Sequence, residues 1–184
     1  MGKFAVIDTE TNWHDQVMSI GTVIAETGTF RPVSLWYHVF PQECSVGGMY
    51  ESTLYIDTPV KPSLCTRREG LADIRRHLER ERVEDIFAYN ACFDYNHLPE
   101  LRDFRWHDIM ALAAYRQYNR KIPPCAACFS TGRLKRGYGV EAMLRLLSGN
   151  QNYCESHNAC FDALEELEIM RLLGQPVSAY KLLR

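Results

Sequence analysis

The sequence lacks any apolar run of membrane-spanning length, and it lacks the charged and apolar regions of a signal peptide. Instead, Met1-Gly2-Lys3 leads directly into a strand-like segment. We therefore expect an intracellular, cytoplasmic protein that does not bind a membrane.

An excess of positive charge is also missing. The chain has 21 Lys and Arg residues against 23 Asp and Glu residues, for a formal net charge of -2. Sequence-independent binding along a nucleic acid requires a clear excess of Lys and Arg, so the composition argues against a protein that coats DNA. It is compatible with an enzyme whose bound metal ions supply the positive charge.

The low hydrophobicity that is typical of a disordered chain is absent too. Hydrophobic residues make up 46% of the sequence and charged residues 24%, which are ordinary values for a globular protein. A length of 184 residues lies within the range of one compact domain and is sufficient to bury a core. We therefore predict a single domain over residues 1–184.

The seven cysteines do not indicate a disulfide framework, because their number is odd and their spacing is scattered. Cys125 and Cys128 have half of the spacing of a zinc ribbon, but no second Cys-x-x-Cys is present. The pair can be interpreted as the centre of a zinc-stabilised interaction module, as a redox dithiol, or as two ordinary loop thiols, and ordinary thiols are the default.

The pattern of apolar residues predicts an α/β domain. The first three strands suggest an antiparallel meander, and the later strands alternate with helices. Thr66 and Glu69 have the spacing of a capping box at the start of a helix, and Gly149 and Gly174 are placed to end two others. The expected strands are 4–7, 17–25, 34–40, 85–90 and 106–110, and the expected helices include 111–120, 140–148 and 158–173. Residues 41–65 are expected to form a long irregular connection, to which the sequence assigns no role.

Acidic residues at the ends of predicted strands are the candidates for chemistry. Asp8 and Glu10 lie two positions apart on a strand, so both side chains project from the same side and can share a divalent metal ion. Asp94 follows a second buried strand, and neighbouring parallel strands bring their carboxyl ends together. Asp162 lies five positions after His157, so a helix can present the carboxylate while the imidazole takes a proton from water. Each of these residues taken alone also fits a solvated turn, a helix cap or a surface histidine.

In combination, these residues resemble the motifs of the DEDDh 3′–5′ exonuclease superfamily, which includes polymerase proofreading subunits, oligoribonuclease and RNase T. The motif Asp-x-Glu-Thr is matched by Asp8 to Thr11, Asn-x-x-Phe-Asp by Asn90 to Asp94, and His-x-Ala-x-x-Asp by His157, Ala159 and Asp162. The match covers residues 4–173 in order and leaves residues 175–184 as a short C-terminal tail. The resemblance implies an RNase H-like fold with a mixed five-stranded sheet flanked by helices.

The resemblance also implies an activity: metal-dependent hydrolysis of phosphodiester bonds at the 3′ end of single-stranded DNA or RNA. Asp8, Glu10, Asp94 and Asp162 would hold two Mg²⁺ or Mn²⁺ ions, with Asp8 as the bridging ligand, and His157 would act as the general base. A polymerase or a second copy of the chain is a candidate partner.

Three further residues are expected to contact the substrate: Thr9, Trp13 and Asn90. Asn12-Trp13 stands where many family members have Thr-Gly, beside the pocket for the terminal nucleotide. The indole of Trp13 is suited either to stacking on a base or to packing in the core.

Two other interpretations of the whole chain remain. A catalytically silent relative would bind only nucleic acid or another protein, although retention of all five site residues favours catalysis. A zinc-stabilised module would carry stoichiometric zinc. Arg133, Lys135 and Arg136 form a short basic cluster among glycines, suited to contact with phosphates or to simple solvation.

Overall fold

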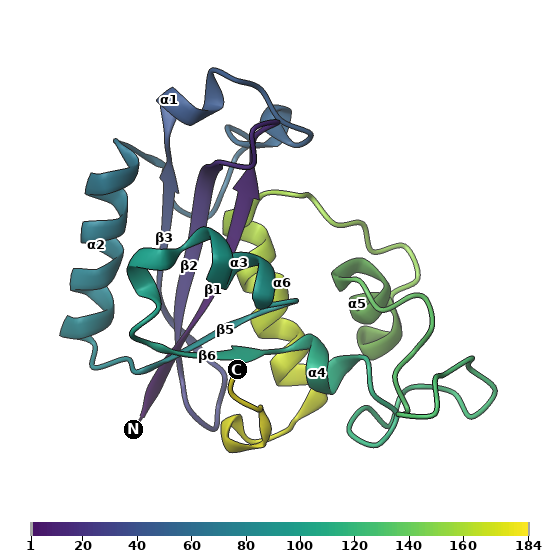
Figure 1. Ribbon diagram of the computed structural model, residues 1–184. Helices are drawn as coiled ribbons and strands as arrows, with labels where there is room; N and C mark the ends of the chain where they lie inside the picture. The colour runs from purple at the N-terminus through teal and green to yellow at the C-terminus, as the bar shows by residue number, and fades with distance from the viewer. Residues whose placement is uncertain (1, 184) are drawn as a thin grey trace.

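A six-stranded mixed sheet forms the centre of the structure (Figure 1). This computed structural model describes residues 2–183, so Met1 and Arg184 of the predicted domain lie outside the described residues. The strands are β1 (Lys3–Thr11), β2 (Val17–Glu26), β3 (Pro32–Val39), β4 (Ser63–Leu64), β5 (Asp85–Ala88) and β6 (Arg105–Asp108). Their order is β4-β3-β2-β1-β5-β6, which confirms the predicted α/β fold class.

The pairing of the strands confirms the antiparallel meander. β1 pairs antiparallel with β2, and β2 pairs antiparallel with β3. β5 pairs parallel with β1, and β6 pairs parallel with β5. The expected count of five strands is corrected to six by β4, which pairs parallel with β3 through only two residues. So short an edge strand leaves no alternating apolar pattern in the sequence.

The helices flank this sheet. They are α1 (Pro41–Cys44), α2 (Arg67–Arg80), α3 (Cys92–His97), α4 (Met110–Ala113), α5 (Val140–Ser148) and α6 (Ala159–Leu173), with 3₁₀ turns η1 (Glu51–Thr53), η2 (Pro99–Leu101) and η3 (Val177–Ala179). The capping box of Thr66 and Glu69 begins α2, and left-handed Gly149 and Gly174 follow α5 and α6. Among residues 2–183, no helix combines the length and the hydropathy needed to cross a bilayer.

The helix predicted over residues 111–120 is wrong, because α4 ends at Ala113 and turns follow. The side chain of the buried Asn119 explains the difference. Its Nδ2 donates to the Ala113 carbonyl at 2.8 Å, and its Oδ1 accepts from the Lys121 amide at 3.0 Å. An asparagine side chain that captures backbone groups in this way competes with helical hydrogen bonding.

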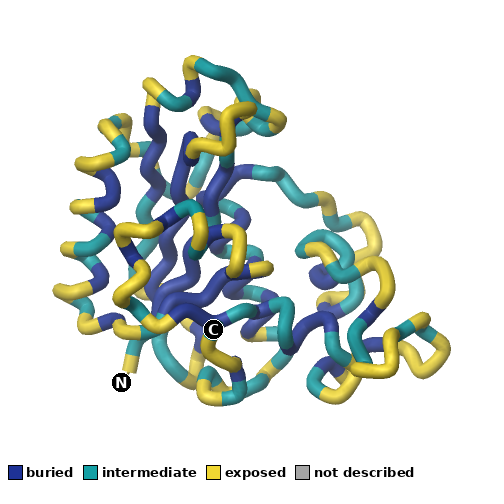
Figure 2. The backbone as a smooth tube through the Cα atoms, viewed as in Figure 1, coloured by how far each residue is buried: buried dark blue, intermediate teal, exposed yellow. Residues whose placement is uncertain are grey.

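The alternation of β1 decides which side of the sheet each site residue faces. Phe4 and Val6 belong to a core cluster that includes residues of α4, α5 and α6, whereas Ala5 and Ile7 belong to a second cluster with residues of α2. Figure 2 shows the sheet as the most continuously buried part of the chain. Continuing the alternation along the strand, Asp8 points to the α6 side of the sheet.

The described residues after α6 pack against the rest of the domain. The side chain of Tyr180 is buried, and the Leu183 amide donates to the Trp106 carbonyl at 2.7 Å. Leu182 forms an isolated β-bridge with His107. The last described residues therefore pack along β6.

Candidate active site

Four predicted carboxylates meet where β1, α3 and α6 come together. Asp8 and Glu10 lie on β1, and Asp162 lies in the first turn of α6. Ligand oxygens of these three residues lie within 4.8 Å of one another. Asp94 lies in the first turn of α3, which begins shortly after β5, the parallel neighbour of β1.

Gly21 allows α6 to approach the sheet at this point. It pairs directly with Asp8 across β1 and β2. A Cβ atom added to Gly21 would lie 1.8 Å from the carbonyl oxygen of Ala159, the first residue of α6. Only glycine leaves room for this contact, and the contact sets the distance between Asp162 and β1.

Asp94 is held by its neighbour on β1. The Thr9 hydroxyl donates to Asp94 Oδ1 at 2.8 Å, and both side chains are buried. Burial raises the pKa of Asp94 to about 7, although the hydrogen bond from Thr9 opposes this shift. Thr9 is thus a buried residue that contacts the cluster through Asp94.

Burial and mutual repulsion raise the pKa values of the carboxyl groups in the cluster. Burial and Glu155 raise the pKa of Glu10 to about 8. Burial, followed by Glu165, Glu155 and Glu10, raises the pKa of Asp162 to about 9. The pKa of Asp8 is also raised, first by burial and then by the surrounding carboxylates. These carboxyl groups must hold protons or gain cations in order to coexist.

Among the four predicted carboxylates, two buried oxygens lack any hydrogen-bond partner. They are Asp8 Oδ2 and Asp162 Oδ1. An unpaired buried carboxylate oxygen is costly, and a hard divalent cation, which prefers oxygen ligands, would satisfy it. The residues of the cluster therefore fit the divalent metal ions that the motifs imply.

Glu166 and Glu155 also belong to this acidic region, and neither was predicted from the sequence. Glu166 is 1% exposed, and its Oε2 has no hydrogen-bond partner. Burial, Asp94 and Asp162 raise its pKa well above the ordinary value of a glutamate. Its position four residues after Asp162 on the same helix was the available signal, since residues four apart share one helix face.

His157 lies just before α6, beside the cluster. Its backbone is left-handed, with φ 51°, and its side chain is 41% exposed. Ligand atoms of His157, Glu155 and Asp162 lie within 4.8 Å of one another, and Nδ1 of the imidazole is 3.9 Å from Glu155 Oε1. The ring stacks on Tyr50, with centroids 4.1 Å apart and planes inclined by 16°.

The long connection between β3 and α2 holds the backbone around His157. The Thr53 hydroxyl donates to the His157 carbonyl, while Asn158 Nδ2 donates to the Thr53 carbonyl at 2.7 Å. Asn158 Nδ2 also donates to the Tyr37 hydroxyl at 3.0 Å, which in turn donates to the Leu54 carbonyl at 2.9 Å. The segment to which the sequence assigned no role thus fixes the residue before α6.

Trp13 and Asn90 lie at the surface near the carboxyl ends of their strands. The Trp13 side chain is 65% exposed, so core packing is not its role. Its amide donates to the Gly47 carbonyl at 3.0 Å, which ties it to the same connection. Asn90 is exposed, has φ 61°, and donates its amide to Asp108 Oδ1 at 3.0 Å.

Cys125 and Cys128 are free thiols on a surface loop. Within residues 2–183, no cluster of three or more potential metal ligands includes either cysteine. The Arg116 guanidinium donates to Cys128 Sγ at 3.4 Å. This arrangement favours two ordinary loop thiols over a zinc centre.

No protein-family model matches the sequence, and no curated relative matches it either. Solved structures do match. The nuclease domain of 3′hExo, a DEDDh family member bound to rAMP, has 13% sequence identity and a TM-score of 0.66, with 99% of this chain and 96% of that chain covered. A 3′-exonuclease structure concerned with recognition of the histone mRNA stem-loop 3′ end has 12% identity and a TM-score of 0.64, covering 98% of this chain and 66% of that chain.

Exonuclease I of E. coli, in complex with a dA16 oligonucleotide, has 15% identity and a TM-score of 0.56. The match covers 97% of this chain but 42% of exonuclease I, so this chain spans less than half of that enzyme. At sequence identities this low, the structural matches show a shared fold and nothing more. The chain therefore has the RNase H-like fold of DEDDh exonucleases, as the motifs implied.

Proposed function

We propose that this protein is a metal-dependent 3′–5′ exonuclease of the DEDDh type. The observation that carries the proposal is the convergence of Asp8, Glu10, Asp94 and Asp162 from three elements, with His157 beside them. The unpaired buried oxygens of Asp8 and Asp162 support a site built for cations. The shared fold with 3′-exonucleases supports the same reaction class.

Asp8, Glu10, Asp94 and Asp162 would hold two Mg²⁺ or Mn²⁺ ions. Such ions would lower the pKa of a bound water and stabilise negative charge on the oxygens at phosphorus. Thr9 positions Asp94 through its 2.8 Å hydrogen bond. Glu166 adds negative charge beneath the cluster and so favours cation binding.

His157 acts in this proposal as the general base, which removes a proton from the attacking water. Its partial exposure leaves the imidazole open to solvent and substrate. Glu155 stabilises the imidazolium that forms, because its carboxylate lies 3.9 Å from Nδ1. Tyr50 and Thr53 hold the residue in place from the opposite side.

The substrate in this proposal is the 3′ end of single-stranded DNA or RNA. The structural neighbours include one protein of each kind: a 3′-exonuclease that recognises a histone mRNA stem-loop, and exonuclease I in complex with a dA16 oligonucleotide. The exposed indole of Trp13 offers a face for stacking on a base. Asn90 is the second proposed substrate contact. Thr9 acts on the substrate indirectly, because its hydroxyl holds Asp94.

The test is digestion of 5′-labelled single-stranded DNA and RNA with Mg²⁺ or Mn²⁺, by the native protein, Asp162→Ala and His157→Ala. We expect a descending ladder that is absent in EDTA and falls on the order of 10³-fold in both variants, because each removes charge or proton transfer in the transition state. Folded protein that cleaves neither strand with either metal would contradict the proposal and favour a silent binder. Equal cleavage by all three proteins would trace the activity to a contaminant.

A further inference from the structure

Residues 115–138, which we call the basic arm, carry positive charge and no acidic residue. The six cations are Arg116, Arg120, Lys121, Arg133, Lys135 and Arg136. All 23 acidic residues of the chain lie outside the arm, together with the other 15 of its 21 basic residues. The small net charge of the whole chain is therefore the sum of a basic segment, residues 115–138, and an acidic remainder.

The cations of the arm also lack carboxylate partners within the described residues. Elsewhere, nine of the 14 described Lys and Arg residues form an ion pair, as Arg75 does with Asp103. Five of the six cations in the arm are exposed, and Arg133 is half-buried. Unpaired exposed cations retain their full attraction for an external anion, which neighbouring carboxylates would otherwise weaken.

Aromatic rings are interleaved with these cations. Lys135 Nζ lies 5.5 Å from the centroid of the Phe129 ring, and the Arg133 guanidinium lies 4.7 Å from that of Tyr138. The Phe129 side chain is 51% exposed. Single-stranded nucleic acids are bound by this combination, with cations along the backbone and aromatic faces against bases. An acidic protein segment is the alternative ligand for these cations, but its binding would not require an exposed aromatic ring such as Phe129.

Backbone hydrogen bonds give the arm a fixed shape. The Phe129 amide donates to the Arg133 carbonyl at 2.8 Å, and the Gly132 amide donates to the Phe129 carbonyl at 2.9 Å. Tyr115 and Arg133 form an isolated antiparallel bridge near the start and end of the arm. Figure 1 shows the segment extending away from the sheet after α4.

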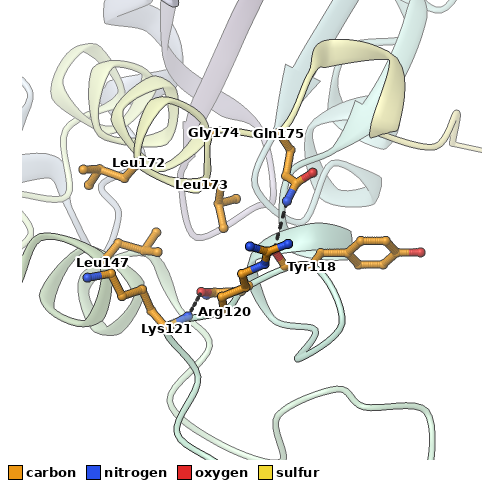
Figure 3. Close-up of a pocket in the computed structure, with 9 residues that line it drawn as sticks. Tyr118, Arg120, Lys121, Leu147, Leu172, Leu173, Gly174 and Gln175 are labelled. Carbon is orange, nitrogen blue, oxygen red and sulfur yellow. Dashed lines mark hydrogen bonds between the residues drawn. The ribbon is translucent and has the colours of Figure 1, made fainter.

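One end of the arm is attached beside the proposed active site. The Tyr89 hydroxyl donates to the Tyr138 carbonyl, and Tyr89 directly precedes Asn90. The other side of the arm contacts the far end of α6, where Gln175 Nε2 donates to the Tyr118 carbonyl at 3.1 Å. There Arg120 and Lys121 line a pocket that contains no carboxylate (Figure 3). The cations thus extend from the Asn90 side of the site toward the end of α6.

We propose that the basic arm binds the phosphate backbone of the single strand, upstream of the 3′ end that the carboxylate site holds. This inference rests on the proposed exonuclease function and adds a second contact to it. The cations supply sequence-independent attraction, and Phe129 supplies a stacking face. Longer strands should therefore bind better than mononucleotide substrates.

Binding of a 5′-labelled 15-nucleotide single strand tests the proposal by fluorescence anisotropy over a series of NaCl concentrations. The measurement uses an Asp162→Asn background without divalent ions, so that the strand stays intact. We expect Lys135→Gln with Arg136→Gln to weaken binding about tenfold at low salt and to reduce the slope of log K against log salt by about 1.4, since each phosphate contact on a single strand contributes about 0.7.

The matched control is Arg68→Gln with Arg82→Gln, which removes the same charge from exposed, unpaired positions outside the arm. This control should show the same slope of log K against log salt as the Asp162→Asn protein without further substitutions. Equal slopes in the arm variant, the control and the parent would overturn the proposal, as would equal losses in the arm variant and the control.

A second measurement separates failure of the arm from failure of the proposed exonuclease. In the otherwise native protein, the arm variant should cleave the p-nitrophenyl ester of thymidine 5′-monophosphate at the native rate, yet show a raised KM for the 15-nucleotide strand. Cleavage of the ester with no change in binding of the strand would refute the arm alone. A changed salt slope with no cleavage of any substrate would support the arm and refute the exonuclease.

Discussion

The two ends of α6 differ in the sign of their charge and in its burial. At the first turn, Asp162 lies among buried carboxylates with raised pKa values. Beyond the last turn, Arg120 and Lys121 lie at the surface with no ion-pair partner among the described residues. Buried charges of one sign destabilise the fold unless the groups hold protons or a counter-ion binds, whereas exposed charges are screened by water and salt. The acidic end is therefore stabilised by protons or by a cation, whereas the basic end is stable without a bound anion and can attract one.

Among substitutions outside the proposed catalytic residues, the largest expected effect comes from separating α6 from the sheet. Gly21→Ala places a methyl group 1.8 Å from the Ala159 carbonyl, so the start of α6 must move. We expect a loss of about 1–3 kcal/mol in the free energy of unfolding. Activity should fall about 100-fold, because displacement of catalytic groups by an ångström has that effect. Chemical denaturation and the labelled-strand assay measure the two losses.

The matched control for that substitution is Gly139→Ala. Gly139 has no atom within 4 Å of an added Cβ, and its φ is negative. It should keep native activity, and it should lose less stability than Gly21→Ala, because the only change is a poorer N-cap of α5. Native activity in Gly21→Ala would mean that the start of α6 can shift without disturbing the site.

A second prediction concerns the stability of the metal-free protein. The pKa values of Asp94, Glu10 and Asp162 are raised to about 7, 8 and 9, and all three lie above the unfolded values near 4. The folded state therefore binds more protons, so this contribution to stability is complete below about pH 4 and is lost as the pH rises through the folded pKa values. In EDTA, Tm should fall by several degrees between about pH 6 and pH 9.

Excess Mg²⁺ should reduce this fall, because bound cations stabilise the ionised carboxylates. Glu166→Gln should reduce it in EDTA as well, since it removes one buried carboxylate from the cluster. Thermal unfolding across the pH series measures both effects. Superimposable curves in EDTA and Mg²⁺ would argue against a metal site at this end of α6.

The smallest expected effect concerns the stacking of Tyr50 on His157. Tyr50→Ala removes the ring that lies 4.1 Å from the imidazole. We expect kcat to fall about tenfold with KM unchanged, because a general base that is less well positioned transfers a proton less efficiently. Tyr50→Phe should retain activity, and Tyr55→Ala provides a control at a tyrosine that is 58% exposed. A raised KM with native kcat would instead assign Tyr50 to substrate contact.

Local patterns in the sequence determined the strands of the meander, the capping box of α2, and the order of the acidic motifs. These features depend on periodicity and spacing over a few residues. The failures were also local: Asn119 ended a predicted helix through its own side chain, and β4 was too short to leave a pattern.

The surroundings of those motifs depend on contacts between residues that are far apart in the sequence. Thr53 and Asn158, more than a hundred residues apart, are joined by a hydrogen bond. Only glycine fits at position 21, because the Ala159 carbonyl at the start of α6 packs against it. Glu166 becomes part of the acidic cluster because α6 packs against β1. Such contacts are set by how whole elements pack, and no short pattern encodes them. The order of the acidic motifs indicates the chemistry proposed for the chain, and the packing of α6 and the connecting segments positions the side chains that would perform it.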